Sequence, residues 1–194
     1  MSFEEVQKCA EFIRGQHAGE MPKIAMVLGS GLNSLADAME DATVLSYADL
    51  DGFPKPTVEG HAGRMLIGAL GGKPVICMQG RAHAYEGHPA ETLAFSTRVL
   101  WALGVEVLVL TNAAGSLREE AGPGSLMAIT DHINFSGINP LVGINDDRFG
   151  PRFPDVSEAW DRKLTKKLQA SAEELGITLH TGVYIMAKGP NFET

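Results

Sequence analysis

The 194-residue sequence predicts an α/β protein in which helices flank a central mixed β-sheet. Two continuously apolar runs, 24–28 and 105–110, end in small residues, which is typical of buried strands in such sheets. Between them, runs 64–70 and 73–78 are joined by two glycines, a pair that favours a tight antiparallel hairpin. We expect a single domain over 1–194, because no linker, repeat or low-complexity tract divides the chain.

The helices are predicted from capping residues and apolar stripes. Ser2 and Glu5 form a capping box before an apolar stripe, so the chain opens with an amphipathic helix. Residues 89–103 carry apolar side chains on most faces of a helix, which indicates a largely buried one. Ser157 is expected to cap a third helix, which Gly176 terminates.

Two further strands are expected at 125–130 and at about 178–187. The intervening residues 131–156 contain Asn, Gly, Pro, Asp and Phe without periodicity. This composition predicts a long ordered loop, and loops of this length are usually functional or disordered.

The composition of the chain limits the partners, the location and the kinds of cysteine site that we expect. Sixteen basic and 24 acidic side chains give a net charge of −8, which disfavours nucleic acid and anionic membrane surfaces as partners. The sequence lacks an apolar run long enough for a membrane span and a signal-peptide pattern, so we expect a cytoplasmic protein. Cys9 and Cys77 lie in different segments without metal-ligand spacing, so neither a disulfide framework nor a metal site is expected.

The glycine turn around Ser30 is the first candidate site. A strand, a Gly-Ser-Gly turn and a hydroxyl with exposed backbone amides at a possible helix start could together cradle a phosphate. The turn lacks the Lys-Ser/Thr of a Walker A loop, and such turns are often purely structural, so both interpretations stay open at this point.

A second candidate follows the strand that ends near residue 78. Arg81, His83 and Tyr85 alternate, so in an extended segment they point to one side. Arg81 could bind a phosphate bidentately, His83 could donate a hydrogen bond, and Tyr85 offers a flat face with a polar tip. The alternative is a surface loop with one ion pair and a packed tyrosine.

Three other positions are weaker candidates. The small residues 111–115 after a buried strand could let backbone amides approach a ligand, or could be a simple turn. Phe192 and Glu193 could stack on and hydrogen-bond to a heteroaromatic ring, or could be solvated. His132 is interpreted as a structural histidine with a satisfied ring.

Together these segments resemble the low-molecular-mass, homotrimeric purine nucleoside phosphorylases, a group that includes the inosine-guanosine and xanthosine enzymes. The resemblance is spread along the chain in family order. The matching segments are 28–32, 60–63, 79–87, 111–115, 131–134, 145–150 and 189–194.

The resemblance implies roles for individual residues. Phosphate would be bound by Ser30, Arg81, His83 and the backbone amide of Ala113, with His61 and Asn112 in support. Tyr85 would lie against the ribose, Phe192 and Glu193 would contact the purine, and Phe153 would close the sugar pocket of a neighbouring subunit. The residues expected to be catalytic are His83 and Glu193, and the expected assembly is a homotrimer.

The implied reaction is the reversible phosphorolysis of 6-oxopurine nucleosides to free base and ribose 1-phosphate, a pentosyl transfer. Inorganic phosphate would be the co-substrate, and no metal or organic cofactor is expected. Members of the group continue beyond the Phe-Glu-Thr motif, so the chain is expected to lack the C-terminal part of the fold and to have impaired turnover. The alternatives are a methylthioadenosine phosphorylase and a non-catalytic phosphate-binding fragment.

Overall fold

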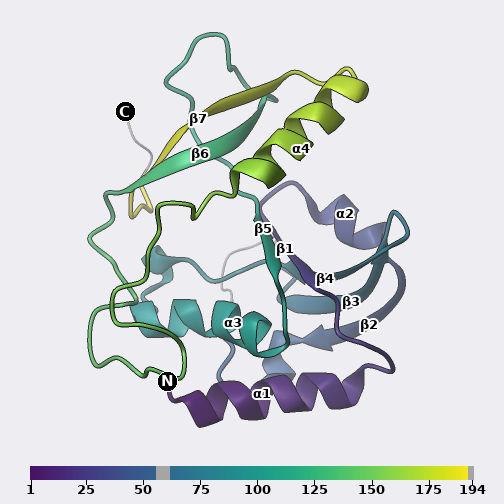
Figure 1. Ribbon diagram of the computed structural model, residues 1–194, viewed down its shortest axis with the longest axis vertical. Helices are drawn as coiled ribbons and strands as arrows, with labels where there is room; N and C mark the ends of the chain where they lie inside the picture. Colours follow the sequence, from purple (N-terminus) through teal and green to yellow (C-terminus); the bar gives the residue numbers. More distant parts are fainter. Residues whose placement is uncertain (56–61, 192–194) are drawn as a thin grey trace. The chain divides into compact units, whose positions relative to one another are not determined.

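The structure is a computed structural model that describes residues 1–55 and 62–191 (Figure 1). The chain forms two compact units. Unit 1 comprises Met1–Ala113 and Asn139–Gly150, and unit 2 comprises Ala114–Ile138 and Pro151–Thr194. A single domain over 1–194 stays a prediction.

Unit 1 is built on a five-stranded mixed sheet in the order β2-β3-β4-β1-β5. Its strands are β1 (Ile24–Leu28), β2 (Glu40–Ser46), β3 (Arg64–Leu70), β4 (Lys73–Gln79) and β5 (Val107–Leu110). β2, β3 and β4 pair antiparallel, whereas β1 runs parallel to both β4 and β5. Gly71 and Gly72 both have positive φ, as a tight primed turn between β3 and β4 requires. The predicted mixed sheet and its hairpin are confirmed.

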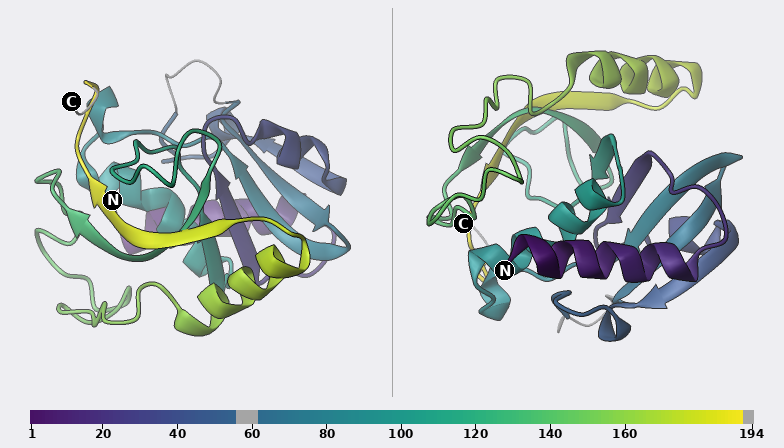
Figure 2. Two further views of the ribbon diagram at one scale, coloured as in Figure 1. Left: turned by 90° about the horizontal axis from the view of Figure 1, so that it is seen from above. Right: turned by 60° about the horizontal axis from the view of Figure 1, so that its bottom comes forward.

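Two helices cover one face of this sheet, α1 (Phe3–Gln16) and α3 (Ala90–Ala102). In Figures 1 and 2 they lie side by side, and their apolar side chains share one core with β1, β3 and β4. The predicted capping box is present, with Ser2 Oγ accepting from Glu5 N at 3.1 Å. The apolar stripe of α1 is buried in this core, as the sequence predicts.

The opposite face carries the short helix α2 (Asn33–Asp37), which packs through Ala36 against Leu28, Leu66 and Cys77. The sequence indicates a helix start after the glycine turn but not the extent of α2, and it does not predict β2. Burial raises the pKa of the Cys77 thiol to about 11, so this cysteine behaves as a small apolar core residue.

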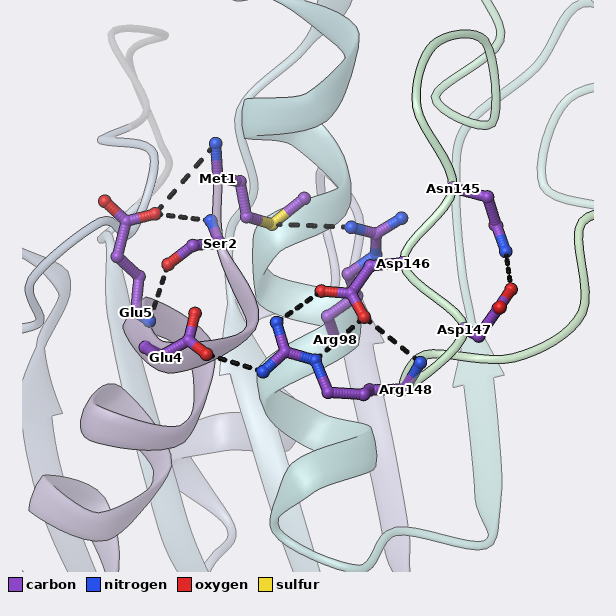
Figure 3. Close-up of polar contacts among 9 residues, drawn as sticks. All are labelled: Met1, Ser2, Glu4, Glu5, Arg98, Asn145, Asp146, Asp147 and Arg148. Atoms are coloured by element: carbon purple, nitrogen blue, oxygen red, sulfur yellow. Dashed lines mark hydrogen bonds and ion pairs between the residues drawn. The ribbon is translucent and has the colours of Figure 1, made fainter.

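The segment Asn139–Gly150, here called the anchor segment, belongs to unit 1 although 25 residues of unit 2 precede it. Figure 3 shows Arg148 between Glu4 of α1 and Asp146, with Nη–carboxylate distances of 2.5 and 2.6 Å. Next to it, the Phe149 ring lies 5.2 Å from the ring of Phe3, and the Arg98 guanidinium lies 4.2 Å from its centroid. The anchor segment is therefore attached to both α1 and α3.

Unit 2 contains a parallel pair of strands, β6 (Leu126–Asn134) and β7 (Leu179–Met186), and the helix α4 (Arg162–Glu174). The predicted strands are confirmed, but β6 extends into the segment that the sequence predicts as loop. The N-cap prediction for α4 is wrong. Asp161, not Ser157, accepts hydrogen bonds from the backbone amides of Lys163 and Leu164 at 2.8 Å.

The correct cap has a simple physical reason. A carboxylate at the N-cap reaches two unpaired amides of the first turn, and these hydrogen bonds hold the pKa of Asp161 below its usual range. Ser157 instead donates its backbone N–H to Asp155 Oδ1 at 2.9 Å in the preceding turn.

His132, in β6, has a satisfied ring, because its Nδ1 accepts a hydrogen bond from Trp160 Nε1 at 2.9 Å. The structural interpretation of this histidine is confirmed. In the ranges 1–55 and 62–191, none of the helices combines the length and the apolar character needed to cross a membrane.

Candidate active site

Three strands of unit 1 bring the first candidate residues to one edge of the sheet. β4, β1 and β5 are adjacent and parallel, with Leu28 paired to Gln79 and Val27 paired to Leu110. Their carboxyl ends therefore meet, which is the place where open α/β sheets bind ligands. Ser30 follows β1, Arg81 follows β4, and Ala113 follows β5.

Thr111 fastens the end of β5 to the glycine turn after β1. Its Oγ1 accepts from Gly29 N at 2.8 Å and donates to Val27 O at 2.9 Å. Gly29 leaves no room for a side chain, because a Cβ there would lie 2.7 Å from Thr111 O and 2.9 Å from Asn112 Cα. The absence of a side chain at position 29 therefore allows the two strand ends to meet.

Arg81 connects the end of β4 to the end of β5. Its Nη1 donates to Thr111 O at 3.2 Å, so the guanidinium lies at the end of β5. One residue earlier, Gly80 O accepts from the buried Tyr47 hydroxyl at 2.9 Å. Burial raises the pKa of Tyr47, which therefore remains a neutral donor and fixes the backbone just before Arg81.

The turn after Arg81 is held by a buried carboxylate. Glu86 is 3% exposed in its side chain, and its Oε1 accepts from His83 N at 2.5 Å and from His83 Nδ1 at 3.0 Å. Because a carboxylate only accepts hydrogen bonds, the proton lies on Nδ1 of His83. Glu86 therefore fixes both the tautomer and the orientation of the ring, with Nε2 on its far side.

Tyr85 stacks on the same imidazole, with ring centroids 4.9 Å apart and an angle of 12° between the planes. The tyrosine is 40% exposed, so it offers one face of its ring to solvent. His83 and Tyr85 thus form a stacked pair of rings, and Glu86 holds the imidazole of this pair through Nδ1.

Small polar groups complete this edge of the sheet. Ser30, Asn112 and Ala113 are exposed, and Asn112 Nδ2 donates to Ala113 O at 3.0 Å. A guanidinium and a hydroxyl that follow adjacent parallel strands, with an imidazole two residues after the guanidinium, are groups that can bind a small anion. The geometry is therefore suited to binding phosphate.

Comparisons with known proteins agree with this geometry. The family model of the phosphorylase superfamily matches residues 23–194. Purine nucleoside phosphorylase 1 of Bacillus subtilis is 49% identical over 191 residues, which is 98% of this chain and 70% of the relative. The chain belongs to the purine nucleoside phosphorylase family.

Other family members extend the match. The purine nucleoside phosphorylase of Bos taurus is 43% identical over 198 residues, covering 100% of this chain and 68% of its own length. A crystal structure of isoform 2 of the Schistosoma mansoni purine nucleoside phosphorylase, in complex with cytosine and ribose-1-phosphate, superposes with a TM-score of 0.92 at 39% identity. It is matched over 69% of its chain and 100% of this one.

The remaining residues expected from the phosphorylase resemblance are not placed in this site by the structure. Phe153 belongs to unit 2 and is 89% exposed, with the Arg152 guanidinium 6.0 Å from its ring centroid. His61, Phe192 and Glu193 lie outside the described residues. The roles of all four stay predictions.

Sequence reasoning assigned no role to three residues that hold the site together, namely Gln79, Glu86 and Thr111. Glu86 could have been found from its spacing, since a carboxylate three residues after a histidine reaches it across a single turn. Thr111, a hydroxyl placed directly after the apolar strand β5, is a similar local signal. Gln79 gives no local signal, because its partners are distant in sequence.

Proposed function

We propose that the site on unit 1 performs the reversible phosphorolysis of purine nucleosides, which yields the free base and ribose 1-phosphate. The observation that carries this proposal is the position of Arg81 at the end of β5, joined to Thr111 O, beside the glycine turn that follows β1. Membership of the purine nucleoside phosphorylase family supports it.

In this reaction a phosphate oxygen attacks the anomeric carbon of the nucleoside. The bond from that carbon to the base nitrogen breaks, and the base leaves with the electron pair and takes up a proton. Positive charge develops on the sugar in the transition state, so a phosphate held close to it is stabilising. Arg81, Ser30 and the amide of Ala113 would hold the phosphate, which places the attacking group before the bond breaks.

His83 would contribute through the side of its ring opposite Glu86. With Nδ1–H donated to Glu86, protonation of Nε2 gives an imidazolium that can donate to phosphate while the carboxylate offsets its charge. Tyr85, stacked on His83, would present its exposed face to the ribose.

The finer features of the proposal come from the resemblance. We propose a 6-oxopurine as the base, contacted by Phe192 and Glu193, with inorganic phosphate as the co-substrate and no organic cofactor or metal. We also propose a cytoplasmic homotrimer in which Phe153 reaches the sugar pocket of a neighbouring subunit. The high exposure of Phe153 supports this last point, since an aromatic ring is costly to leave in water.

The test is the release of hypoxanthine from inosine by the purified chain, measured with and without inorganic phosphate. We expect phosphate-dependent release with ribose 1-phosphate formed in equal amount, and its loss in Arg81→Ala. Methylthioadenosine serves as the competing substrate. Release that does not require phosphate would contradict phosphorolysis, and phosphate binding without release would favour a non-catalytic phosphate-binding fragment.

A further inference from the structure

Gln79, the last residue of β4, has a side-chain amide in the core of unit 1. It is 3% exposed, and across residues 1–55 and 62–191 it is the one polar or charged residue that is fully buried. Burying an amide is unfavourable unless its polar atoms are hydrogen-bonded. Both polar atoms of this amide are hydrogen-bonded. Oε1 accepts from Arg64 Nε at 2.5 Å, and Nε2 donates to Asn33 Oδ1 at 3.3 Å.

The two partners belong to different segments around the site. Asn33 begins α2 and comes three residues after Ser30, whereas Arg64 begins β3. The Arg64 guanidinium also lies 3.9 Å from Asp37, the last residue of α2. The short helix that follows the glycine turn is therefore connected at both of its ends to the Arg64–Gln79 pair.

The backbone of Gln79 is held to the residue before β3 and leads directly to Arg81, in the other half of the site. Gln79 O accepts from Gly63 N at 3.0 Å, and Arg81 follows only two residues later. One side chain thus links the segment carrying Ser30 with the strand whose end carries Arg81. Neither Ser30 nor Arg81 contributes to this link.

We propose that Gln79 is a positioning residue for phosphate binding, fixing the glycine turn relative to the Arg81–His83 segment through Asn33 and Arg64. This inference rests on the proposed function. A site for a small, rigid anion depends on donors held at fixed separations before the ligand arrives. A loosened link between Ser30 and Arg81 would therefore weaken phosphate binding without altering any residue that touches phosphate.

The strand provides a matched control. Cys77 lies two residues before Gln79 and so faces the same side of the sheet, where it packs in the apolar cluster with Ala36 of α2. Cys77→Ala perturbs packing between β4 and α2 but leaves the hydrogen bonds of Gln79 in place. Comparison with this variant therefore distinguishes a general loss of stability from a specific loss of phosphate affinity.

The experiment measures the dissociation constant of inorganic phosphate by calorimetry, and the melting temperature, for the wild type, Gln79→Met, Asn33→Ala and Cys77→Ala. Gln79→Met retains an unbranched side chain of similar size but has no amide. Asn33→Ala removes the hydrogen bond between Asn33 and Gln79 from the side of α2. Asn33 is only half-buried, so this variant tests the same link if Gln79→Met does not fold. Where the chain turns over inosine, KM is measured separately for phosphate and for inosine.

We expect Gln79→Met and Asn33→Ala to weaken phosphate binding about tenfold, roughly one decade in the dissociation constant, while KM for inosine changes by less than about twofold. Cys77→Ala should lower the melting temperature but keep the wild-type affinity for phosphate. Wild-type affinity in both link variants, or an equal loss in Cys77→Ala, would overturn the inference while the proposed function stands. A wild-type chain that does not bind phosphate would overturn both.

Discussion

The Arg81–Glu86 segment and the anchor segment use the same kinds of side chain in opposite ways. Each combines an arginine, a carboxylate and an aromatic ring within a few residues. Glu86 is 3% exposed and fixes His83, whereas Arg148 is 51% exposed and pairs with two solvent-accessible carboxylates. Burial of Glu86 makes its contact a rigid support for the imidazole, whereas the exposed ion pairs of Arg148 are weakened by water and salt.

The largest effect in this comparison is expected from Arg81→Ala. Removing one preorganised charged donor lowers kcat/KM for phosphorolysis about a hundredfold, close to 3 kcal/mol of transition-state stabilisation. Arg148→Ala, the matched change in the anchor segment, should leave kcat/KM within about twofold. Steady-state kinetics with inosine and phosphate measures both, and equal losses in the two variants would erase the distinction between the regions.

Gly29→Ala tests how closely the strand ends must approach. The added Cβ meets backbone atoms of Thr111 and Asn112 that belong to a paired strand end and its turn, so it should destabilise the fold by about 1–3 kcal/mol and weaken phosphate binding. Gly122→Ala is the control, because a Cβ there meets no atom within 4 Å. Denaturant unfolding gives the free energies, and equal values for the two variants would contradict this account of the turn.

Glu86→Gln tests the buried support alone. The amide keeps the volume and one acceptor but loses the charge that holds Nδ1–H of His83, so phosphate affinity should fall about tenfold. Asp146→Asn makes the same chemical change in the anchor segment and should leave phosphate affinity unaltered. Calorimetric titration with phosphate distinguishes them, and an unaffected Glu86→Gln protein would show that His83 does not need its carboxylate.

The smallest effect belongs to Arg148→Gln, for which we expect a decrease in melting temperature of about 2 °C at low salt. Hydrogen bonds from Arg148 hold the pKa values of Glu4 and Asp146 below their usual range. The stabilisation is therefore present above the ordinary carboxyl pKa and is lost as pH falls through the depressed values. The difference from wild type should vanish in 1 M salt and in acid, and a difference that persists there would assign it to packing of Arg148 on Phe3.

The features predicted from sequence are those that local chemistry specifies. The Ser2–Glu5 capping box, the two-glycine hairpin and the strand ends near Ser30, Arg81 and Ala113 each depend on neighbouring residues, and the structure confirms them as local structure. The extent of α2 could not be predicted, because its five residues are too few for a helical stripe.

β2 was missed for a different reason. It carries two acidic residues at its start, an irregular register between Glu40 and Thr43, and Asp41 at φ 50°. A strand with this composition and an interrupted register has no clean alternation, and its place in the sheet is set by close contact with Gly68 of β3.

The rest of the site could not be predicted because its contacts are long-range. The partners of Gln79 lie 15 and 46 residues away in the sequence, so no local pattern indicates that its amide is shared between them. Outside the site, the choice of Asp161 over Ser157 as N-cap is local, and it is decided by which residue lies within reach of two helix amides. Such choices depend on the folded backbone and not on residue type alone.

The anchor segment belongs to unit 1 but follows part of unit 2 in the sequence, so unit 1 cannot be completed until that part of unit 2 has been synthesised. Once β5 has been synthesised, the chain contains all five strands of the sheet. Phe149, the partner of Phe3, is added 39 residues after Leu110, the last residue of β5. Until then the Phe3 ring and the neighbouring indole of Trp101 have no cover from the anchor segment. Unit 1 therefore completes its packing only after the anchor segment has been made, and until then part of its aromatic surface is uncovered.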